Sequence, residues 1–267
     1  MPWVTLEGWH DPGAPRCLSE RRVVLRHWGM PPEDEPPERR ARTHAERLAF
    51  VREHTASRPV PLVPEISVRV ASEVTPLWHA TEAWLASRGI DPPFWAFPWA
   101  GGQVLARYLL DTPAEVRDLR VLDFASGSGL VAIAAARAGA REVVAVDIDP
   151  LAIAATELNA EASGVSVEAR AEDVTGHGLA DRFDVVLAGD VFYDAGAAAR
   201  FLPWFRELAA AGVRVLVGDP GRTYVPTRGV SCLFRADVPV PLGLESRETL
   251  ASRVLSVEPM GDVRPTS

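Results

Sequence analysis

Lysine is missing from this chain of 267 residues, and glutamine and asparagine occur once each, as Gln103 and Asn159. All 28 basic side chains counted as lysine or arginine are therefore arginines. Cysteine is also scarce: Cys17 and Cys232 are the only two, and their separation matches no metal-binding or redox motif. We expect two incidental thiols in a reducing compartment.

Long apolar runs and excess positive charge are lacking as well. No run approaches the roughly 18 residues that a membrane-spanning helix needs, and the first residues lack the basic and then apolar pattern of a secretory signal peptide. The formal net charge of −8 argues against a general binder of nucleic acids or anionic membranes. The six histidines form no ligand spacing, so we expect no metal. These features predict a cytoplasmic globular protein.

The composition divides the chain into three parts. Residues 1–55 form an N-terminal extension in which Pro, Arg and Glu dominate positions 30–42, a composition that resists core formation. We expect it to be partly disordered, with a short helix over 43–53. Residues 56–257 form the main domain, and residues 258–267 a flexible tail.

The main domain carries signals for both strands and helices. Residues 62–70 are predicted to be extended, and 75–89 to be a helix that Thr75 and Pro76 begin and Gly89 ends. An aromatic loop, PPFWAFPWAGG, follows at 92–102, and then a helix at 104–110. Further strands are predicted at 120–124, 143–147, 165–169, 183–188, 213–218, 230–238 and 250–257, and further helices at 130–138, 150–163 and 197–211.

This order of elements predicts the fold class. Strands that alternate with helices form βαβ units and a parallel sheet. The last two strands have no helix between them and therefore form a hairpin. We expect a Rossmann-like α/β fold with a seven-stranded, mostly parallel sheet, helices on both faces, a C-terminal antiparallel hairpin and the short N-terminal extension.

The stretch VLDFASGSG at 121–129 carries the main ligand signal. Gly127 and Gly129 allow a tight turn between strand and helix. The same glycines match the G-x-G-x-x-[GA] dinucleotide fingerprint, which alone is weak. Asp123 decides between the two ligands, because a carboxylate at the strand tip repels a pyrophosphate at the helix N-terminus but attracts the ammonium of S-adenosylmethionine. The sequence therefore favours the methyl donor over a dinucleotide, and over a turn without a ligand.

The other donor contacts follow from the rule that ligands lie at the carboxyl ends of the strands. Asp147 can accept both ribose hydroxyls, and Ile148 can cover one adenine face. Asp173 can accept from the adenine amino group, although a solvated acidic turn explains it equally well, and Trp99 can stack on the donor or pack in the core. The residues predicted to bind the donor are Trp99, Gly101, Asp123, Ala125, Ser126, Gly127, Gly129, Asp147, Ile148, Asp173 and Gly189.

The methyl acceptor is predicted beyond the fourth strand of the sheet, in FDVVLAGDVFYD at 183–194. Methyl transfer is a displacement in which the protein mainly positions two reactants. We assign Asp190 and Tyr193 as catalytic residues: Asp190 docks and orients the acceptor, and Tyr193 with Phe192 shapes a channel for an aliphatic stem. The alternative for Asp190 is a simple turn former. No Asn-Pro-Pro-Tyr element follows the strand, which argues against a DNA-base or glutamine methyltransferase.

Several stretches together carry a family resemblance: PLWHATEAWL, PPFWAFPWAGGQVLARYLLD, RVLDFASGSGLVAIAAARAGA, DIDPLAIAATELNA, VVLAGDVFYD and VLVGDPGRTYVP. From about 59 to 257 the chain resembles the electron-transfer-flavoprotein β-subunit lysine methyltransferase family, whose bacterial members are often labelled nicotinamide N-methylase-like. The glycine motif is shared by many methyltransferases. The Trp-x-Gly-Gly, Asp-Val-Phe-Tyr and Gly-Asp-Pro-Gly-Arg segments are more specific.

The resemblance implies methylation of lysine side chains on a folded protein partner, the electron transfer flavoprotein β subunit. It implies that Asp123, Gly127, Gly129 and Asp147 hold S-adenosylmethionine, that the acceptor lies near Asp190 and Tyr193, and that residues 219–222 border the substrate entrance. Two alternatives stay open: an N-methyltransferase for a small amine or a nicotinamide-like ring, and a catalytically silent protein that binds the donor.

Overall fold

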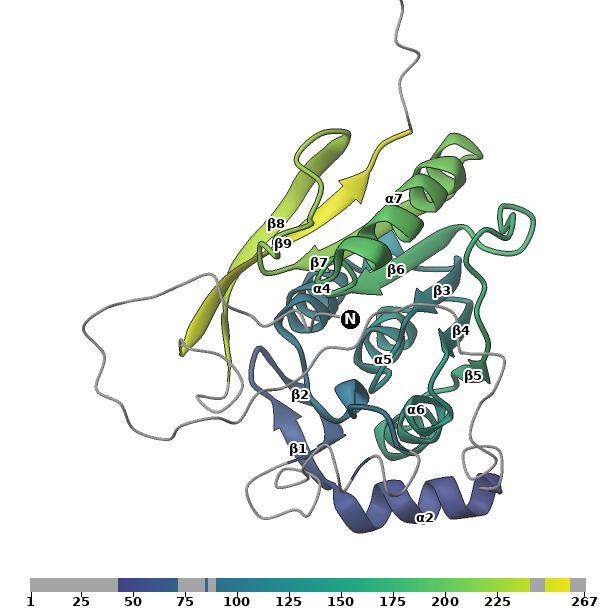
Figure 1. Cartoon of the computed structure of the whole chain (residues 1–267), viewed down its shortest axis with the longest axis vertical. Helices are drawn as coiled ribbons and strands as arrows, with labels where there is room; N and C mark the ends of the chain where they lie inside the picture. Colours follow the sequence, from purple (N-terminus) through teal and green to yellow (C-terminus); the bar gives the residue numbers. More distant parts are fainter. Residues whose placement is uncertain (1–42, 72–84, 86–89, 241–247, 260–267) are drawn as a thin grey trace, which may run out of the picture.

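The computed structural model describes residues 43–71, 85, 90–240 and 248–259 (Figure 1). The predictions for residues 1–42, the helix at 75–89 and most of the tail at 258–267 lie outside the described residues, apart from Leu85 in that helix. Among the described residues, no helix is both long and apolar enough to cross a bilayer.

The centre of the fold is a seven-stranded sheet with the strand order β5-β4-β3-β6-β7-β9-β8 (Figure 1). The strands are β3 (Arg120–Phe124), β4 (Glu142–Asp147), β5 (Glu168–Ala171), β6 (Val185–Gly189), β7 (Arg214–Asp219), β8 (Val230–Pro239) and β9 (Thr249–Val257). The first five pair in parallel, whereas β9 pairs antiparallel with β7 and with β8. The order reverses between β3 and β6, which is where ligands bind in open α/β sheets.

Helices cover both faces of the sheet (Figure 1). They are α4 (Ala100–Asp111), α5 (Leu130–Arg137) and α6 (Pro150–Ser163) on one face and α7 (Ala195–Ala210) on the other. Successive side chains of the buried strands point to opposite faces of the sheet and so contribute to both core layers. Val121 and Leu187 pack with α4 and α5, whereas Leu122 and Val186 pack with α7. The predicted Rossmann-like fold with its antiparallel C-terminal hairpin is confirmed.

Local signals account for the ends of most helices. Asp149 accepts a hydrogen bond from the Leu151 amide at the start of α6, and Gly164 ends that helix in the left-handed region. The helix predicted at 43–53 is α2 (His44–His54), which Thr43 begins with a capping box. Phe50 of this helix is buried against the α6 region, so the helix packs onto the domain.

Three local predictions differ from the structure. The segment 92–102 is not wholly a loop, since it holds the 3-10 turns η2 (Phe94–Ala96) and the start of α4. The strand predicted at 165–169 lies three residues later, as β5. The extended segment is β2 (Val63–Val70), and its partner β1 (Ala56–Val60) escaped prediction because its sequence, ASRPV, shows no apolar alternation. A further turn, η3 (Pro113–Glu115), follows α4.

Candidate active site

The predicted donor residues meet where β3 and β4 end side by side. Asp123 of β3 pairs in register with Ala145 of β4, and Asp147 is the last residue of β4. Both aspartates are buried. Asp123 Oδ2 accepts a hydrogen bond of 2.9 Å from the Ala132 amide in α5. The structure thus places two carboxyl groups at one edge of the sheet, at the base of the glycine turn.

Hydrogen bonds to β4 and to α6 hold the glycine turn in place. The Gly127 amide donates to Asp147 Oδ2 at 2.9 Å, and Thr156 Oγ1 of α6 donates to the Gly127 carbonyl at 3.2 Å. Gly129 has a φ of 74° as the residue that begins α5, and a Cβ there would lie 2.7 Å from the Thr156 side chain. Only glycine therefore fits at 129, both for its backbone conformation and for the close approach of α6.

The buried carboxyl groups resist ionisation. Burial raises the pKa of Asp123 to about 8, opposed by the Ala132 amide and increased by the charge of Asp147. Burial also raises the pKa of Asp147, against hydrogen bonds from the amides of Asp149 and Gly127. A cationic group beside them would favour their charged forms, whereas a pyrophosphate would raise their pKa values further.

Other features of this edge also fit S-adenosylmethionine, which carries an ammonium and a sulfonium. Ser126 Oγ is shielded from solvent and has no hydrogen-bond partner among the residues that the structure describes, which leaves a polar group for a ligand to satisfy. Ile148, directly after Asp147, has 47% of its surface exposed and so offers an apolar face to the adenine. Ala125 has a φ of 55°, a strained conformation of the kind that clusters at ligand sites.

Two predicted donor residues have other partners in the structure. Asp173 forms an ion pair with Arg200 of α7 and accepts from the Thr175 amide at 3.0 Å. This pairing outweighs burial and lowers the pKa of Asp173. Trp99 precedes α4, and its indole N–H donates to the Phe94 carbonyl at 2.7 Å. Contacts of Asp173 and Trp99 with the donor stay predictions that compete with these interactions.

Asp190 occupies the predicted acceptor position directly after β6. Its φ of 56° places a non-glycine residue in the left-handed region. Its amide donates to the Gly218 carbonyl of β7 at 2.9 Å, and its Oδ2 accepts from the Gly102 amide at 2.9 Å. The side chain thus caps the first turn of α4, which comes from a distant part of the chain.

Glycines let the start of α4 lie directly against the ends of β6 and β7. A Cβ on Gly101 would lie 2.3 Å from the Gly218 carbonyl oxygen, and one on Gly218 would lie 2.0 Å from the Gly101 carbonyl oxygen. A Cβ on Gly189 would lie 2.9 Å from Gly102 Cα. Gly101 and Gly189 were predicted to bind the donor, and the structure shows a packing reason for glycine at both positions.

The charge environment of Asp190 is mixed. Burial raises its pKa to about 7, opposed by the nearby Arg222 and increased by Asp219. Within the described part of the chain, Asp190 Oδ1 has no hydrogen bond, and it lies 3.7 Å from an Nη of Arg222. Asp219 is fully buried, and its Oδ1 accepts from the amides of Gly221 and Arg222. Asp190 therefore keeps one oxygen for a further donor.

The two aromatic residues after Asp190 differ in their surroundings. The Tyr193 ring lies 6.2 Å from the Phe94 ring, next to the aromatic segment. Phe192 is fully buried and packs edge-to-face on Phe205 of α7. The prediction that Phe192 lines a substrate channel is wrong, because its ring belongs to the core.

Sequence reasoning missed the residues that act through their backbone or by position. They are Gly102 and Ala132, whose amides bind the two aspartates; Gly218, which contacts α4; and Thr156 and Asn159 of α6, which hold the glycine turn. The Gly-Gly pair at 101–102 and the Gly-Asp pair at 218–219 were visible signals. A side-chain motif search does not register them because their role lies in close backbone contact.

Comparisons with known proteins find related methyltransferases. A family model described as "Ribosomal protein L11 methyltransferase (PrmA)" matches residues 104–191. The protein named electron transfer flavoprotein beta subunit lysine methyltransferase is 40% identical in Xenopus laevis, over 65% of this chain and 70% of that protein. Its human counterpart is 38% identical, over 65% and 66%. A Caenorhabditis elegans homologue is 32% identical, over 60% and 71%.

Proposed function

The chain belongs to the electron transfer flavoprotein β subunit lysine methyltransferase family, and we propose that it transfers a methyl group from S-adenosylmethionine to lysine side chains of a protein. We also propose that this protein is the β subunit of the electron transfer flavoprotein, as the relatives' names state for them. The observation that carries the proposal is the pair of buried acids at the ends of β3 and β4, next to a third buried acid, Asp190, after β6.

In this proposal, the edge formed by β3 and β4 holds the donor. Asp123 pairs with the amino-acid ammonium, Asp147 accepts from the ribose hydroxyls, and Ile148 covers the adenine. Both oxygens of Asp147 already accept one backbone amide each, which fixes the carboxylate and leaves further lone pairs for hydroxyl donors. When bound, S-adenosylmethionine supplies a methyl group on a positively charged sulfur, which an uncharged amine can accept.

Asp190 receives the acceptor. An approaching ammonium finds Oδ1 of Asp190 without a hydrogen bond, in a buried site where a charge-assisted contact is strong. The Gly102 amide and the Gly218 carbonyl fix the orientation of this residue. Because the pKa of Asp190 is raised to about 7, the group can exchange a proton near neutral pH, which suits the removal of a proton from an acceptor amine. Tyr193 completes the wall of the acceptor site in this proposal.

We further propose that the protein has no nucleic-acid or membrane partner and that it is cytoplasmic. The formal net charge of −8 and the lack of long apolar runs in the sequence support this.

The test is a transfer assay with the purified full-length chain, labelled S-adenosylmethionine and the purified β subunit of the electron transfer flavoprotein. We expect label in the protein fraction. Nicotinamide and simple amines serve as alternative acceptors. Label that enters only these small molecules would contradict the proposal. It would instead support the alternative function, a small-molecule N-methyltransferase.

A further inference from the structure

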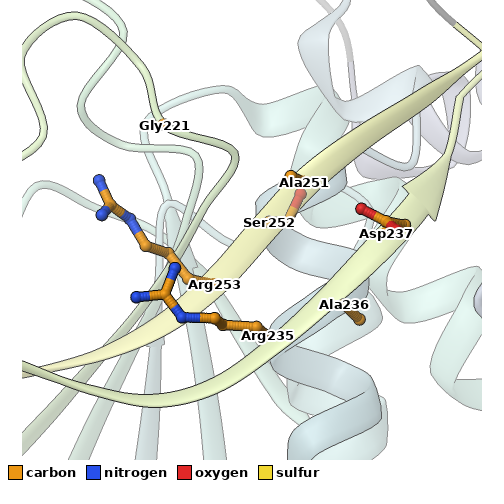
Figure 2. Close-up of a pocket in the computed structure, with 7 residues that line it drawn as sticks. All are labelled: Gly221, Arg235, Ala236, Asp237, Ala251, Ser252 and Arg253. Atoms are coloured by element: carbon orange, nitrogen blue, oxygen red, sulfur yellow. The ribbon is translucent and has the colours of Figure 1, made fainter.

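The β8–β9 hairpin carries a pocket that the donor and acceptor sites do not use. Arg235 of β8 and Arg253 of β9 are direct partners in the register of the two strands. With Gly221, Asp237 and Ser252 they line a pocket of about 480 Å³. Figure 2 shows both guanidinium groups pointing toward the loop that carries Gly221, with Asp237 further along the hairpin.

The two arginines face each other, and the acid in register with them is Asp219 of β7, opposite Arg253. Neither forms an ion pair with another residue in the part of the chain that the structure describes, and Arg253 Nε is shielded from solvent without a hydrogen-bond partner. Like charges at directly opposed positions of an antiparallel pair destabilise it. An anionic group bound between them would remove this repulsion and satisfy the donors.

The remaining charges around the pocket limit what can bind. Asp219 lies opposite Arg253 in the pairing of β7 with β9; its Oδ1 accepts from two backbone amides, and its Oδ2 has no hydrogen bond among the described residues. Asp237 is two residues from Arg235 on the same face of β8 and adds one negative charge at the far end. Because Asp219 and Asp237 offset part of the charge of the two arginines, the pocket suits a single carboxylate better than a multiply charged free anion.

The pocket borders the acceptor site. The Asp190 amide donates to the Gly218 carbonyl of β7, and the next residue of β7, Asp219, pairs with Arg253 of β9. A polypeptide whose lysine reaches Asp190 therefore passes near Arg253.

We propose that Arg235 and Arg253 bind a carboxylate side chain of the protein substrate, on residues near the lysine that Asp190 receives. This inference rests on the proposed function. A planar guanidinium group can bind a carboxylate through two parallel hydrogen bonds. Arg253 is partly buried and forms the base of the carboxylate site, and the exposed Arg235 forms its rim. The contact would select substrates in which an acidic residue accompanies the lysine.

The first test measures methylation kinetics with the β subunit as acceptor. We expect the Arg235→Gln and Arg253→Gln variants to raise KM for the protein substrate about tenfold, with kcat and donor affinity nearly unchanged. Arg117→Gln is the control, because Arg117 is exposed and precedes β3 at the opposite end of the strands. Arg235 is exposed, so Arg235→Gln keeps the test valid if Arg253→Gln does not fold. Unchanged KM in both variants would overturn the proposal.

The second test does not depend on transfer. A hexaglutamate peptide is titrated onto the full-length protein, and we expect Arg235→Gln to weaken its binding about tenfold while Arg117→Gln has no effect. If no lysine is methylated but this difference holds, the proposed function fails and the carboxylate pocket stands. Equal peptide binding by wild type and Arg235→Gln, or displacement of the peptide by an equal concentration of inorganic phosphate, would overturn it.

Discussion

At the scale of single residues, the site is built from acids that the fold keeps out of water. Asp123, Asp147 and Asp190 are all buried, and burial raises the pKa of each. A buried carboxyl group without a cation costs stability when it ionises. A bound cation stabilises the charged forms of these residues, so the site favours cationic ligands. In the proposed function, these ligands are the donor and an ammonium acceptor.

Asp123→Asn should separate binding from stability. Asparagine keeps an oxygen that can accept from the Ala132 amide but cannot pair with an ammonium. We expect donor affinity to fall at least about tenfold, while the ligand-free variant unfolds about 2–4 °C higher at pH 8, since no buried charge forms. Calorimetric titration and thermal unfolding measure the two effects. Donor binding at wild-type strength would show that Asp123 does not hold the ammonium.

Asp190→Asn should stop transfer and leave donor binding largely intact. Asparagine tolerates the positive φ of this position, and its side-chain oxygen can still accept from the Gly102 amide. Only the charge and its proton chemistry are lost, so we expect kcat to fall at least about a hundredfold. Asp190→Ala removes the cap as well and should also lower stability. Normal transfer by Asp190→Asn would refute the acceptor assignment.

At this scale the sequence predicted the acids better than their partners. Asp123, Asp147 and Asp190 follow from strand ends and glycine turns, which are local patterns. The Arg200 partner of Asp173 and the buried position of Phe192 depend on how α7 lies on the sheet, which no local pattern encodes.

At the scale of elements, the start of α4 connects the aromatic segment at 92–102 to the acceptor site. Its first turn lies against the ends of β6 and β7, where the approach of backbone to backbone excludes side chains. The sequence predicts a loop over 92–102, and a Gly-Gly pair weakens a helix by propensity. Tertiary contact with Asp190 overrides that propensity, which explains why α4 begins four residues earlier than predicted.

Adjacent glycines in α4 provide a matched comparison. A Cβ at Gly101 would clash with the Gly218 carbonyl and the Asp190 side chain, whereas one at Gly102 would meet only Val131 Cγ2 at 3.9 Å. We expect Gly101→Ala to destabilise the protein by about 1–3 kcal/mol through overpacking. Gly102→Ala should be neutral, or stabilising by up to about 1 kcal/mol. Denaturant unfolding of both variants measures this, and equal effects would contradict the packing explanation.

At the scale of the whole molecule, the buried acids predict how stability depends on pH. An unfolded aspartate has a pKa of about 3.9, so between about pH 4 and pH 8 the folded ligand-free protein binds more protons at Asp123 and Asp190 than the unfolded chain does. Stability should therefore fall as pH rises through this window. Asp184, whose pKa Arg120 lowers to about 2, contributes a constant amount there because it is lost only in stronger acid.

Urea unfolding of the ligand-free protein at pH 6 and pH 8.5 checks this sign. We expect the lower midpoint at pH 8.5 and a smaller difference in Asp123→Asn. S-adenosylmethionine should restore stability at pH 8.5, since a ligand at about 100 times its Kd adds about 2.7 kcal/mol. A midpoint that rises with pH in the ligand-free wild type would contradict the electrostatic account.

The fold as a whole could be predicted from the sequence, because only a few topologies are compatible with a chain of alternating strands and helices. Strand β1 could not be, since its sequence shows no apolar alternation, and neither could the contacts of β2 with α6, which are distant in sequence; Arg69 of β2, for example, donates through its amide to Asn159.

The central claim is methyl transfer to lysine of a protein, and peptide mass spectrometry tests it most directly. The β subunit of the electron transfer flavoprotein is incubated with the enzyme and isotopically labelled S-adenosylmethionine, with Asp190→Asn as the matched control. The account predicts labelled methyl groups on lysine side chains with the wild type and none with the variant. Unlabelled lysines, together with label on a small molecule or on another residue type, would contradict it.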